Sequence, residues 1–306
     1  MNRPCVLALG FFDGVHLGHG GLLKKTREVA DRLGLPAAAL TFDTHPDTLV
    51  FGADVPLLNT PREREYLMRT RYGIDEVRTL HFDRATMAQP WQDFVRTTLC
   101  TQHRAAFVVC GHDFRFGARA EGTPERLQAL CETLGIGCAC IPKITLEGET
   151  VSSTLIRSLL EQGEAARAVR FLGHPHILSG TVVSGQKLGR TLGIPTANLR
   201  PAEGILIPRF GVYAGWAEFD GQRRMAVVNI GVRPTVHGDA VTVEPWLLDF
   251  DGDLYGHELR LELTDFLRPE RRFASLDALQ EEIRRNAAQT RALLQEQQTE
   301  KTNRHT

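Results

Sequence analysis

The chain has 306 residues, of which 42% are hydrophobic and 24% charged, and its 36 basic and 37 acidic residues give a net charge of −1. This composition is that of a globular protein and excludes an intrinsically disordered chain. The balanced charge provides no extended field for nucleic acid or for an anionic membrane surface, so an anionic ligand has to be bound locally. The length suits two domains, each with its own core.

The start of the chain and the lack of a long apolar run indicate a cytoplasmic protein. The first residues lead directly into a short apolar strand without a secretion signal, and no apolar run reaches the length of a membrane span. All six cysteines lie in the first half, without CxxC spacing or a nearby histidine pair that would suggest a zinc site. We therefore expect reduced thiols in the core.

The first half alternates short β-rich runs with amphipathic segments, which is typical of a parallel α/β sheet. The five predicted strands cover residues 6–9, 37–42, 77–82, 106–109 and 138–141. Thr60-Pro61 and Thr123-Pro124 each place a capping hydroxyl before a proline, which marks the start of a helix. We predict a doubly wound parallel α/β domain over residues 1–173.

A helical stretch over residues 152–173 ends the first half, and the rhythm then changes. Two turn pairs, Asp220-Gly221 and Asp251-Gly252, suit tight hairpins between strands. The predicted hairpins join residues 217–219 to 225–230, and 247–250 to 254–255. These runs favour a small antiparallel β-barrel.

The chain ends in one more predicted helix. Ser275 caps this helix, which carries apolar residues at three- and four-residue spacing. The second domain is therefore expected over residues 174–296, followed by a disordered polar tail over 297–306.

The first candidate site is the run GFFDGVHLGH, from Gly10 to His19, which follows the first strand and enters the first helix. Unpaired N–H groups and the dipole of a helix start favour an anion there. His16 and His19 can donate hydrogen bonds to phosphate oxygens from one side of that turn. Gly14 and Gly18 let the backbone approach a nucleotide closely. Taken alone, the HxGH quartet fits two unrelated surface histidines at least as well.

A second run, VSSTLIR over residues 151–157, favours the phosphate interpretation. Ser152, Ser153 and Thr154 place three hydroxyls at a helix start, and Arg157 follows one turn later. Plain N-capping would explain the hydroxyls if the histidines were absent. Both runs belong to one α/β domain, which binds ligands at the carboxyl ends of its strands.

Together, HxGH and SSTxxR resemble the nucleotidyltransferase superfamily. The longer runs 10–19, 41–46 (TFDTHP) and 111–117 (GHDFRFG) resemble the FMN adenylyltransferase part of bacterial bifunctional riboflavin kinase/FAD synthetases. This resemblance implies that the phosphate of FMN attacks the α-phosphate of ATP, giving FAD and pyrophosphate, with His16 and His19 as catalytic residues. It also implies nucleotide or phosphate contacts from Gly10, Phe12, Gly14, Gly18, Ser153, Thr154 and Arg157, and flavin contacts from Asp113, Phe114 and Arg115.

The run GQKLGRTLGIPTAN, over residues 185–198, is a third candidate. It is not a Walker loop, because Lys187 is displaced from the second glycine and no Ser or Thr follows it. The Thr196 hydroxyl and the Asn198 carbonyl oxygen suit a hard cation such as Mg²⁺ beside phosphates. On spacing alone, a glycine-rich barrel loop with Asn198 bonded to local backbone is the simpler interpretation.

Later runs decide in favour of a second active site. In order, residues 229–235, 243–244, 248–250, 253–256 and 267–270 resemble the riboflavin kinase part of the same family, so the resemblance covers about residues 5 to 295. It implies transfer of the γ-phosphoryl group of ATP to the 5′-hydroxyl of riboflavin, which needs a metal and a carboxylate base. The implied residues are Thr196 and Asn198 for Mg²⁺, Glu244 as base, Gly189 and Arg190 for nucleotide, and Arg268 for flavin. From its strand position alone, Glu244 could equally be a solvated carboxylate.

Departures from the family pattern leave alternatives open. Thr44, Leu155, His174 and Trp246 stand where proline, arginine, arginine and histidine are common. Pro245 removes a ladder hydrogen bond and restricts the residue before it to extended geometry, so it either holds Glu244 in place or tips it away.

We therefore expect a cytoplasmic enzyme that uses ATP and Mg²⁺ to convert riboflavin to FMN and FMN to FAD. Its partners are these small molecules, not nucleic acid or a membrane, and self-association is left open. Two alternatives are an enzyme with only one of the activities and a flavin-binding regulatory protein without turnover.

Overall fold

The computed structural model describes residues 3–45, 48, 49, 52, 54–184, 194–235 and 238–303. The chain divides into two compact units, Met1–Leu155 and Ile156–Thr306. This division falls earlier than the boundary at residue 173 that the sequence suggested. Helix α8 (Ala165–Leu172) packs in the second unit, where Ala165 belongs to the hydrophobic core.

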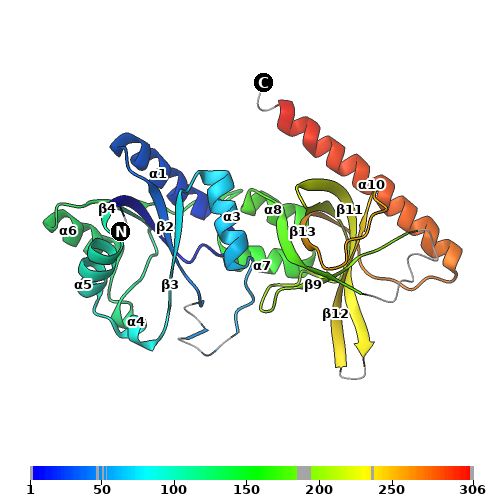
Figure 1. Cartoon of the computed structure of the whole chain (residues 1–306), viewed down its shortest axis with the longest axis horizontal. Helices are drawn as coiled ribbons and strands as arrows, with labels where there is room; N and C mark the ends of the chain where they lie inside the picture. The colour runs from blue at the N-terminus through cyan, green and yellow to red at the C-terminus, as the bar shows by residue number, and fades with distance from the viewer. Residues whose placement is uncertain are drawn as a thin grey trace. The chain divides into compact units, whose positions relative to one another are not determined.

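The first unit is built on a parallel five-stranded sheet, as the sequence predicted, and its strands β2, β3 and β4 are labelled in Figure 1. The strand order is β3-β2-β1-β4-β5. The strands are β1 (Cys5–Leu9), β2 (Ala37–Phe42), β3 (Glu76–Leu80), β4 (Ala105–Gly111) and β5 (Gly137–Ile141). The chain order reverses between β1 and β4, because β2 and β3 lie on one side of β1 and the others lie on the opposite side. Ligands bind at the carboxyl ends of the strands at such a switch point.

Helices connect these strands, and the predicted capping residues begin two of them. The helical segments of this unit are the 3₁₀ turn η1 (Asp13–Val15), α1 (Leu17–Leu33), α3 (Pro61–Tyr72), α4 (Arg84–Ala88), α5 (Trp91–Asp93), the π-helical segment η2 (Phe94–Gln102), the 3₁₀ turn η3 (Ala118–Ala120), α6 (Pro124–Thr133) and the start of α7 (Ser153–Gln162). Thr60 and Glu63 form a reciprocal capping box on α3, and the Thr123 hydroxyl accepts from the N–H of Arg126 on α6. A small hairpin, β6 (Thr145–Leu146) and β7 (Glu149–Thr150), precedes α7.

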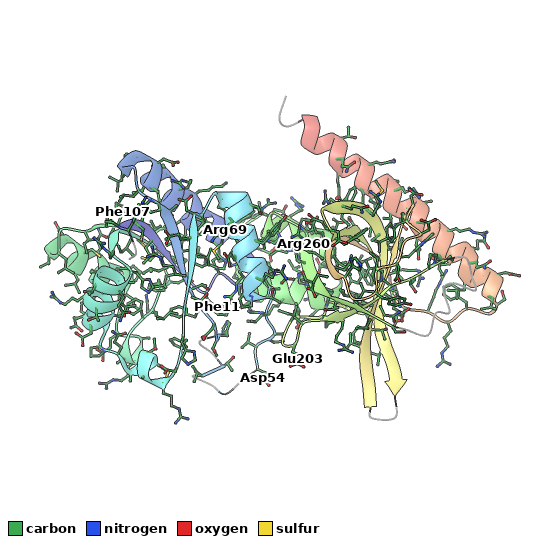
Figure 2. All side chains as sticks on the ribbon, in the orientation of Figure 1. Phe11, Asp54, Arg69, Phe107, Glu203 and Arg260 are labelled. Carbon is green, nitrogen blue, oxygen red and sulfur yellow. The ribbon has the colours of Figure 1, made fainter. Side chains whose placement is uncertain are left out.

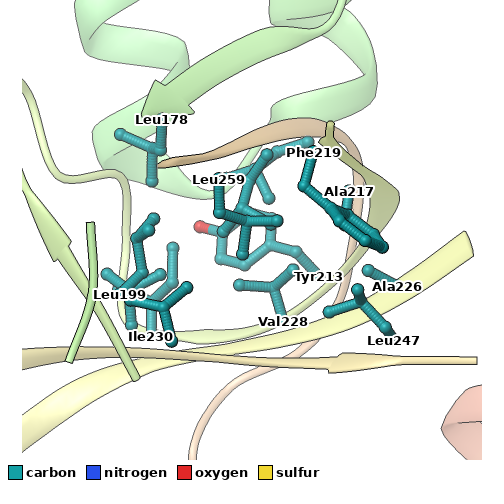
Figure 3. Packing of buried hydrophobic residues seen from close by; sticks show 14 of the residues in the cluster. Leu178, Leu199, Tyr213, Ala217, Phe219, Ala226, Val228, Ile230, Leu247 and Leu259 are labelled. Atoms are coloured by element: carbon teal, nitrogen blue, oxygen red, sulfur yellow. The ribbon is translucent and has the colours of Figure 1, made fainter. Parts of the chain in front are cut away.

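The second unit is a closed antiparallel barrel with the order β10-β11-β12-β9-β8-β13, which confirms the predicted fold. Its strands are β8 (His176–Val183), β9 (Asn198–Pro201), β10 (Gly211–Phe219), β11 (Gln222–Thr235), β12 (Gly238–Leu247) and β13 (Glu258–Arg268). Alternate side chains of each strand fill the interior, where the fully buried Tyr213 lies among Val228 and Leu259 (Figure 3).

One predicted hairpin forms and the other does not. Strands β10 and β11 turn at Asp220-Gly221, with Phe219 paired to Gln222. The predicted hairpin at Asp251-Gly252 is wrong, because residues 254–255 are not in a strand and the next strand, β13, pairs with β8 and β10. The connecting loop is tied to the last helix instead, since Arg291 binds both carboxylate oxygens of Asp249 at 2.7 and 2.9 Å.

The last helix, α10 (Leu276–Asn303), begins where Ser275 accepts a hydrogen bond from the N–H of Ala278, as predicted. It continues beyond residue 297, so the predicted disordered tail is wrong as far as residue 303. Leu294 is fully buried, and the Gln297 side chain donates to the Asp265 carboxylate on β13 at 2.9 Å. Packing on the barrel therefore extends a segment whose composition alone is that of a polar tail.

Within the described residues, we find no helix that combines the length and the apolar character needed to cross a membrane.

Candidate active sites

The loop after β1 has an unusual backbone that presents the histidine run. Phe11, labelled in Figure 2, is its second residue, after Gly10, and Phe12 follows in the left-handed region with φ 58°. Gly14 also has a positive φ, 81°, which glycine adopts without strain. The Phe12 side chain is fully buried and lies edge-on to the His19 ring, with 5.3 Å between centroids. The loop is thus anchored by Phe12 before the chain enters α1.

His16 and His19 meet at the first turn of α1. Nδ1 of His16 accepts a hydrogen bond from the backbone N–H of His19 at 3.2 Å, which makes His16 the N-cap. The two rings stack with 3.6 Å between centroids and 13° between planes. A methyl group on Gly18 would lie 3.0 Å from the His16 ring and 3.3 Å from the carbonyl oxygen of Val151. The close approach of helix, ring and neighbouring chain therefore requires glycine at this position.

His19 is partly buried and held neutral. Burial lowers the pKa of His19 well below its usual value, and the nearby His16 and Arg64 lower it further. Its Nδ1 is buried and has no hydrogen-bond partner in the protein. A neutral imidazole carries one N–H, so His19 can donate one hydrogen bond to a ligand.

Arg64, on α3, is a component of this site that the sequence analysis missed. Its side chain is fully buried, and Nη1 donates to the Phe11 carbonyl at 2.6 Å and to the Thr41 hydroxyl at 3.1 Å. The guanidinium also lies 4.4 Å from the centre of the Phe11 ring. Its spacing in the sequence could have identified it. Arg64 lies three and four residues before Leu67 and Met68, so it shares the buried face of an otherwise charged helix.

The serine run adjoins the same loop. The Ser153 hydroxyl donates to the backbone carbonyl of Asp13 at 2.9 Å, while the Ser152 hydroxyl caps α7 by accepting from the N–H of Leu155 at 3.2 Å. Thr154 is exposed, and Arg157 lies one helical turn beyond Ser153. Capping and loop contact are therefore divided between two adjacent serines.

The run 113–115 follows β4, the strand next to β1 across the switch point. Asp113 and Arg115 are exposed, and the Phe114 ring stacks on Phe116 with 5.4 Å between centroids. The Arg115 guanidinium donates to the Phe114 carbonyl at 3.1 Å. The histidine loop and this run thus lie at the carboxyl ends of neighbouring parallel strands, which places them at one edge of the sheet.

A second candidate site is a cavity of about 380 Å³ between the outer face of the barrel and α10. Glu244 on β12 lies directly opposite Asn229 on β11, and both line the cavity. Further lining residues include Thr196, Trp246, Arg268, Glu270, Arg271 and Phe273. Aromatic and apolar surface with a few converging polar groups is typical of a small-molecule site.

Thr196 also lines a smaller cavity of about 50 Å³ at the barrel, together with Ala197, Phe250 and Tyr255. The two cavities therefore share a wall at this threonine. Gly189 and Arg190, which the sequence analysis assigned to nucleotide binding, lie outside the described residues.

The oxygen groups of Thr196 and Asn198 fit a hard cation. Ala197 and Leu199 pack with the barrel core, so alternation along the extended chain turns Thr196 and Asn198 to the opposite side. A hydroxyl and an amide oxygen suit Mg²⁺, which keeps several waters and binds phosphates. Among the described residues, no group of three or more His, Cys, Asp or Glu side chains could hold a metal by itself.

Pro245 does not disturb the pairing of β12 with β11. Its carbonyl accepts from the N–H of Ala197 at 2.9 Å, and in an antiparallel ladder the N–H and C=O of one residue point to the same neighbour. The missing N–H therefore lies on the side away from β11. Glu244, which precedes it, stays in extended geometry and lines the cavity.

Each half of the chain matches a known protein family. A family model described as FAD synthetase matches residues 1–155, and one described as riboflavin kinase matches residues 172–294. Bifunctional riboflavin kinase/FMN adenylyltransferase of Escherichia coli K12 is 39% identical over 290 residues, which is 93% of this chain and 91% of that protein. The chain belongs to this family.

Other members of the bifunctional family are similar over a comparable span. The Listeria monocytogenes protein is 35% identical over 94% of this chain and 91% of its own length, and the Bacillus subtilis protein is 32% identical over 92% and 90%. The chain accordingly has riboflavin kinase and FAD synthetase activities, with ATP and flavins as substrates.

One solved structure has the same architecture over nearly the whole chain. It is described as a macrolide-efflux protein from Streptococcus pneumoniae, and it matches with a TM-score of 0.86 and 30% identity over 95% of each chain. This similarity supports the α/β and barrel folds described above.

Proposed function

We propose that the two activities use separate sites, one at the parallel sheet and one at the barrel. For FAD synthesis, the observation that supports this assignment is the reversal of strand order between β1 and β4. It puts His16 and His19 next to the run 113–115 at the carboxyl edge of the sheet. Phosphates would bind at the first turn of α1, and the flavin of FMN would lie toward Phe114.

In the adenylyl transfer, an oxygen of the FMN phosphate forms a bond to the α-phosphorus of ATP and the bond to pyrophosphate breaks. The imidazoles of His16 and His19 donate hydrogen bonds to the phosphate oxygens, on which charge develops. Ser153 and Thr154 supply hydroxyls, and Arg157 offsets the negative charge of the leaving pyrophosphate. Positioning and charge stabilisation account for most of the catalysis in such reactions.

In the kinase reaction, we assign the 380 Å³ cavity to riboflavin and the smaller cavity to the phosphate end of ATP. Glu244 accepts the proton of the 5′-hydroxyl of riboflavin. The hydroxyl oxygen forms a bond to the γ-phosphorus of ATP, and the bond to ADP breaks. Thr196, in the shared wall, stands with Asn198 where a magnesium ion would neutralise the phosphates. Arg268 contacts the flavin from the end of β13.

The test supplies riboflavin or FMN separately with ATP and magnesium, and resolves the flavins by chromatography. We expect His19→Ala to lower FAD formation by about 10²–10³-fold and to spare FMN formation. Glu244→Gln should lower FMN formation by roughly 10²–10⁴-fold and spare the conversion of FMN to FAD. His257→Ala and Glu258→Gln, at exposed positions of the second unit, are the matched controls. If either active-site variant stayed folded and lost both activities, separate sites would be wrong.

A further inference from the structure

Glu282 on α10 is a buried carboxylate at the centre of a cluster of arginines. Only 5% of its surface is exposed. Its Oε1 lies 3.2 Å from Nε of Arg268 and 2.7 Å from Nη2 of Arg285, and its Oε2 lies 2.5 Å from Nη2 of Arg271. The Asn286 amide also donates to Oε1, at 3.2 Å. One carboxylate thus holds three guanidinium groups.

Two of these arginines, Arg268 and Arg271, line the cavity with Glu244 and Glu270, whereas Glu282 is not part of the lining. The Arg268 guanidinium is fixed further by Asn286, whose Oδ1 accepts from Nε at 3.1 Å, and by the Pro269 carbonyl. A guanidinium has five N–H donors in a rigid fork. When the donors on one edge are bound, the remaining N–H groups point away from that edge and can bind another partner.

The charged residues of the cavity wall would pair with one another unless the arginines were held in place. The cavity wall contains two carboxylates and two guanidiniums, and unanchored arginines would pair with the carboxylates across the cavity. Burial raises the pKa of Glu282, but hydrogen bonds from Arg285 and Asn286, with the charges of Arg271 and Arg285, lower it overall. Glu282 therefore stays ionised and keeps its partners.

We propose that Glu282 is a positioning residue for riboflavin binding, which holds Arg268 and Arg271 against the cavity wall so that their free N–H groups face the substrate. This inference rests on the assignment of the cavity to riboflavin. Glu282 lies behind the arginines and acts through them. Its contribution should be equal in the ground state and the transition state, so it should affect KM more than kcat.

The test is Glu282→Gln in the full chain, which keeps the shape of the side chain and removes its charge. We expect the KM and Kd of riboflavin to rise roughly tenfold, as for the loss of one charge-assisted hydrogen bond. The kinase kcat should stay within about twofold, and FAD formation from FMN should be unchanged. Glu281→Gln, at the exposed neighbouring position of the same helix, is the matched control and should behave as the unchanged protein.

A rescue variant separates positioning from packing. In Glu282→Gln/Asn286→Asp the carboxylate is restored one turn along the helix, at the position that already accepts from Arg268. We expect riboflavin KM to return to within about threefold of its original value. An unchanged KM in Glu282→Gln would refute the proposal, as would a fall in kcat at constant KM, a loss of both activities, an equal effect of Glu281→Gln, or absence of rescue. Glu244→Gln tests the cavity assignment independently: if that variant kept full kinase activity, the cavity assignment itself would fail.

Discussion

Nδ1 of His16 accepts a hydrogen bond from the backbone N–H of His19, and this contact determines how the His16 ring can act. An accepting nitrogen has no proton, so in the neutral imidazole the proton is on Nε2. The helix cap therefore selects the tautomer that can donate to a phosphate oxygen. Local structure and the proposed chemistry depend on the same atom.

His16→Asn separates these two roles. Asparagine is a good N-cap, so the start of α1 should be retained and the free energy of unfolding should change by less than about 0.5 kcal/mol. FAD formation should nevertheless fall by about 100-fold or more, because the imidazole is lost. His16→Ala should lose the same activity and a further ~1 kcal/mol of stability. Urea unfolding and the FMN-to-FAD rate check the pair, and equal stability of the two variants would contradict the capping role.

Arg64→Met tests the buried arginine. Removing the guanidinium leaves the carbonyls of Phe11 and Phe42 without this donor, which should cost about 3 kcal/mol. FAD formation should fall at least tenfold, because the histidine loop loses its anchor, while FMN formation is retained. Arg64→Lys keeps the charge without the fork and should be intermediate. Thermal unfolding and both flavin assays measure this, and full FAD synthesis in Arg64→Met would exclude the role.

Thr196→Val removes a hydroxyl at nearly constant volume. If Thr196 binds magnesium, the concentration of magnesium that gives half the maximal kinase rate should rise about tenfold or more. The magnesium dependence of FAD formation should not change. Thr181→Val, at a partly exposed position on β8, is the control. An unaltered magnesium titration of the kinase would remove Thr196 from the proposed ligands.

Pro245→Val tests whether proline is needed beside Glu244. Because the missing N–H points away from β11, valine should fit the strand. We expect the free energy of unfolding to change by less than about 1 kcal/mol, and the kinase kcat/KM to stay within a few-fold. A large fall in kinase activity with normal folding would show that the proline itself holds Glu244 in position.

His176 makes the stability of the second unit depend on pH. Burial, with a smaller effect of His174, lowers the pKa of His176 to about 4, so the folded protein keeps this ring neutral. The unfolded chain takes up the proton near pH 6.5. The stabilisation is thus complete above that pH and is lost as pH falls toward 4, by up to about 3 kcal/mol.

In His176→Phe this contribution should disappear. Urea unfolding at several pH values between 7.5 and 5 should show a flatter dependence than in the unchanged protein. Gln222→Ala, which alters an exposed uncharged residue of the second unit, should keep the original slope. Parallel curves for His176→Phe and the unchanged protein would contradict the prediction.

The sequence predicted the elements whose signals are local. Alternating apolar runs gave the five parallel strands, and Thr60, Thr123 and Ser275 marked helix starts, because a capping hydroxyl acts on backbone groups within three residues. The motifs also identified the family to which each half of the chain belongs. Each of these signals depends on neighbours in the chain.

Only the tertiary structure decided the rest. Three features depend on which distant segment lies alongside: the absence of a hairpin at Asp251-Gly252, the helix past Gln297 and the side to which Pro245 lacks its N–H. The same is true of the two anchoring contacts, from Arg64 to the His16 loop and from Glu282 to the cavity arginines. A charged residue in a charged helix gives only a weak sequence signal of burial, because the partners that offset its desolvation lie far along the chain. The sequence by itself therefore determined the family and indicated the residue types of both proposed sites, and long-range packing determined which side chains hold them in place.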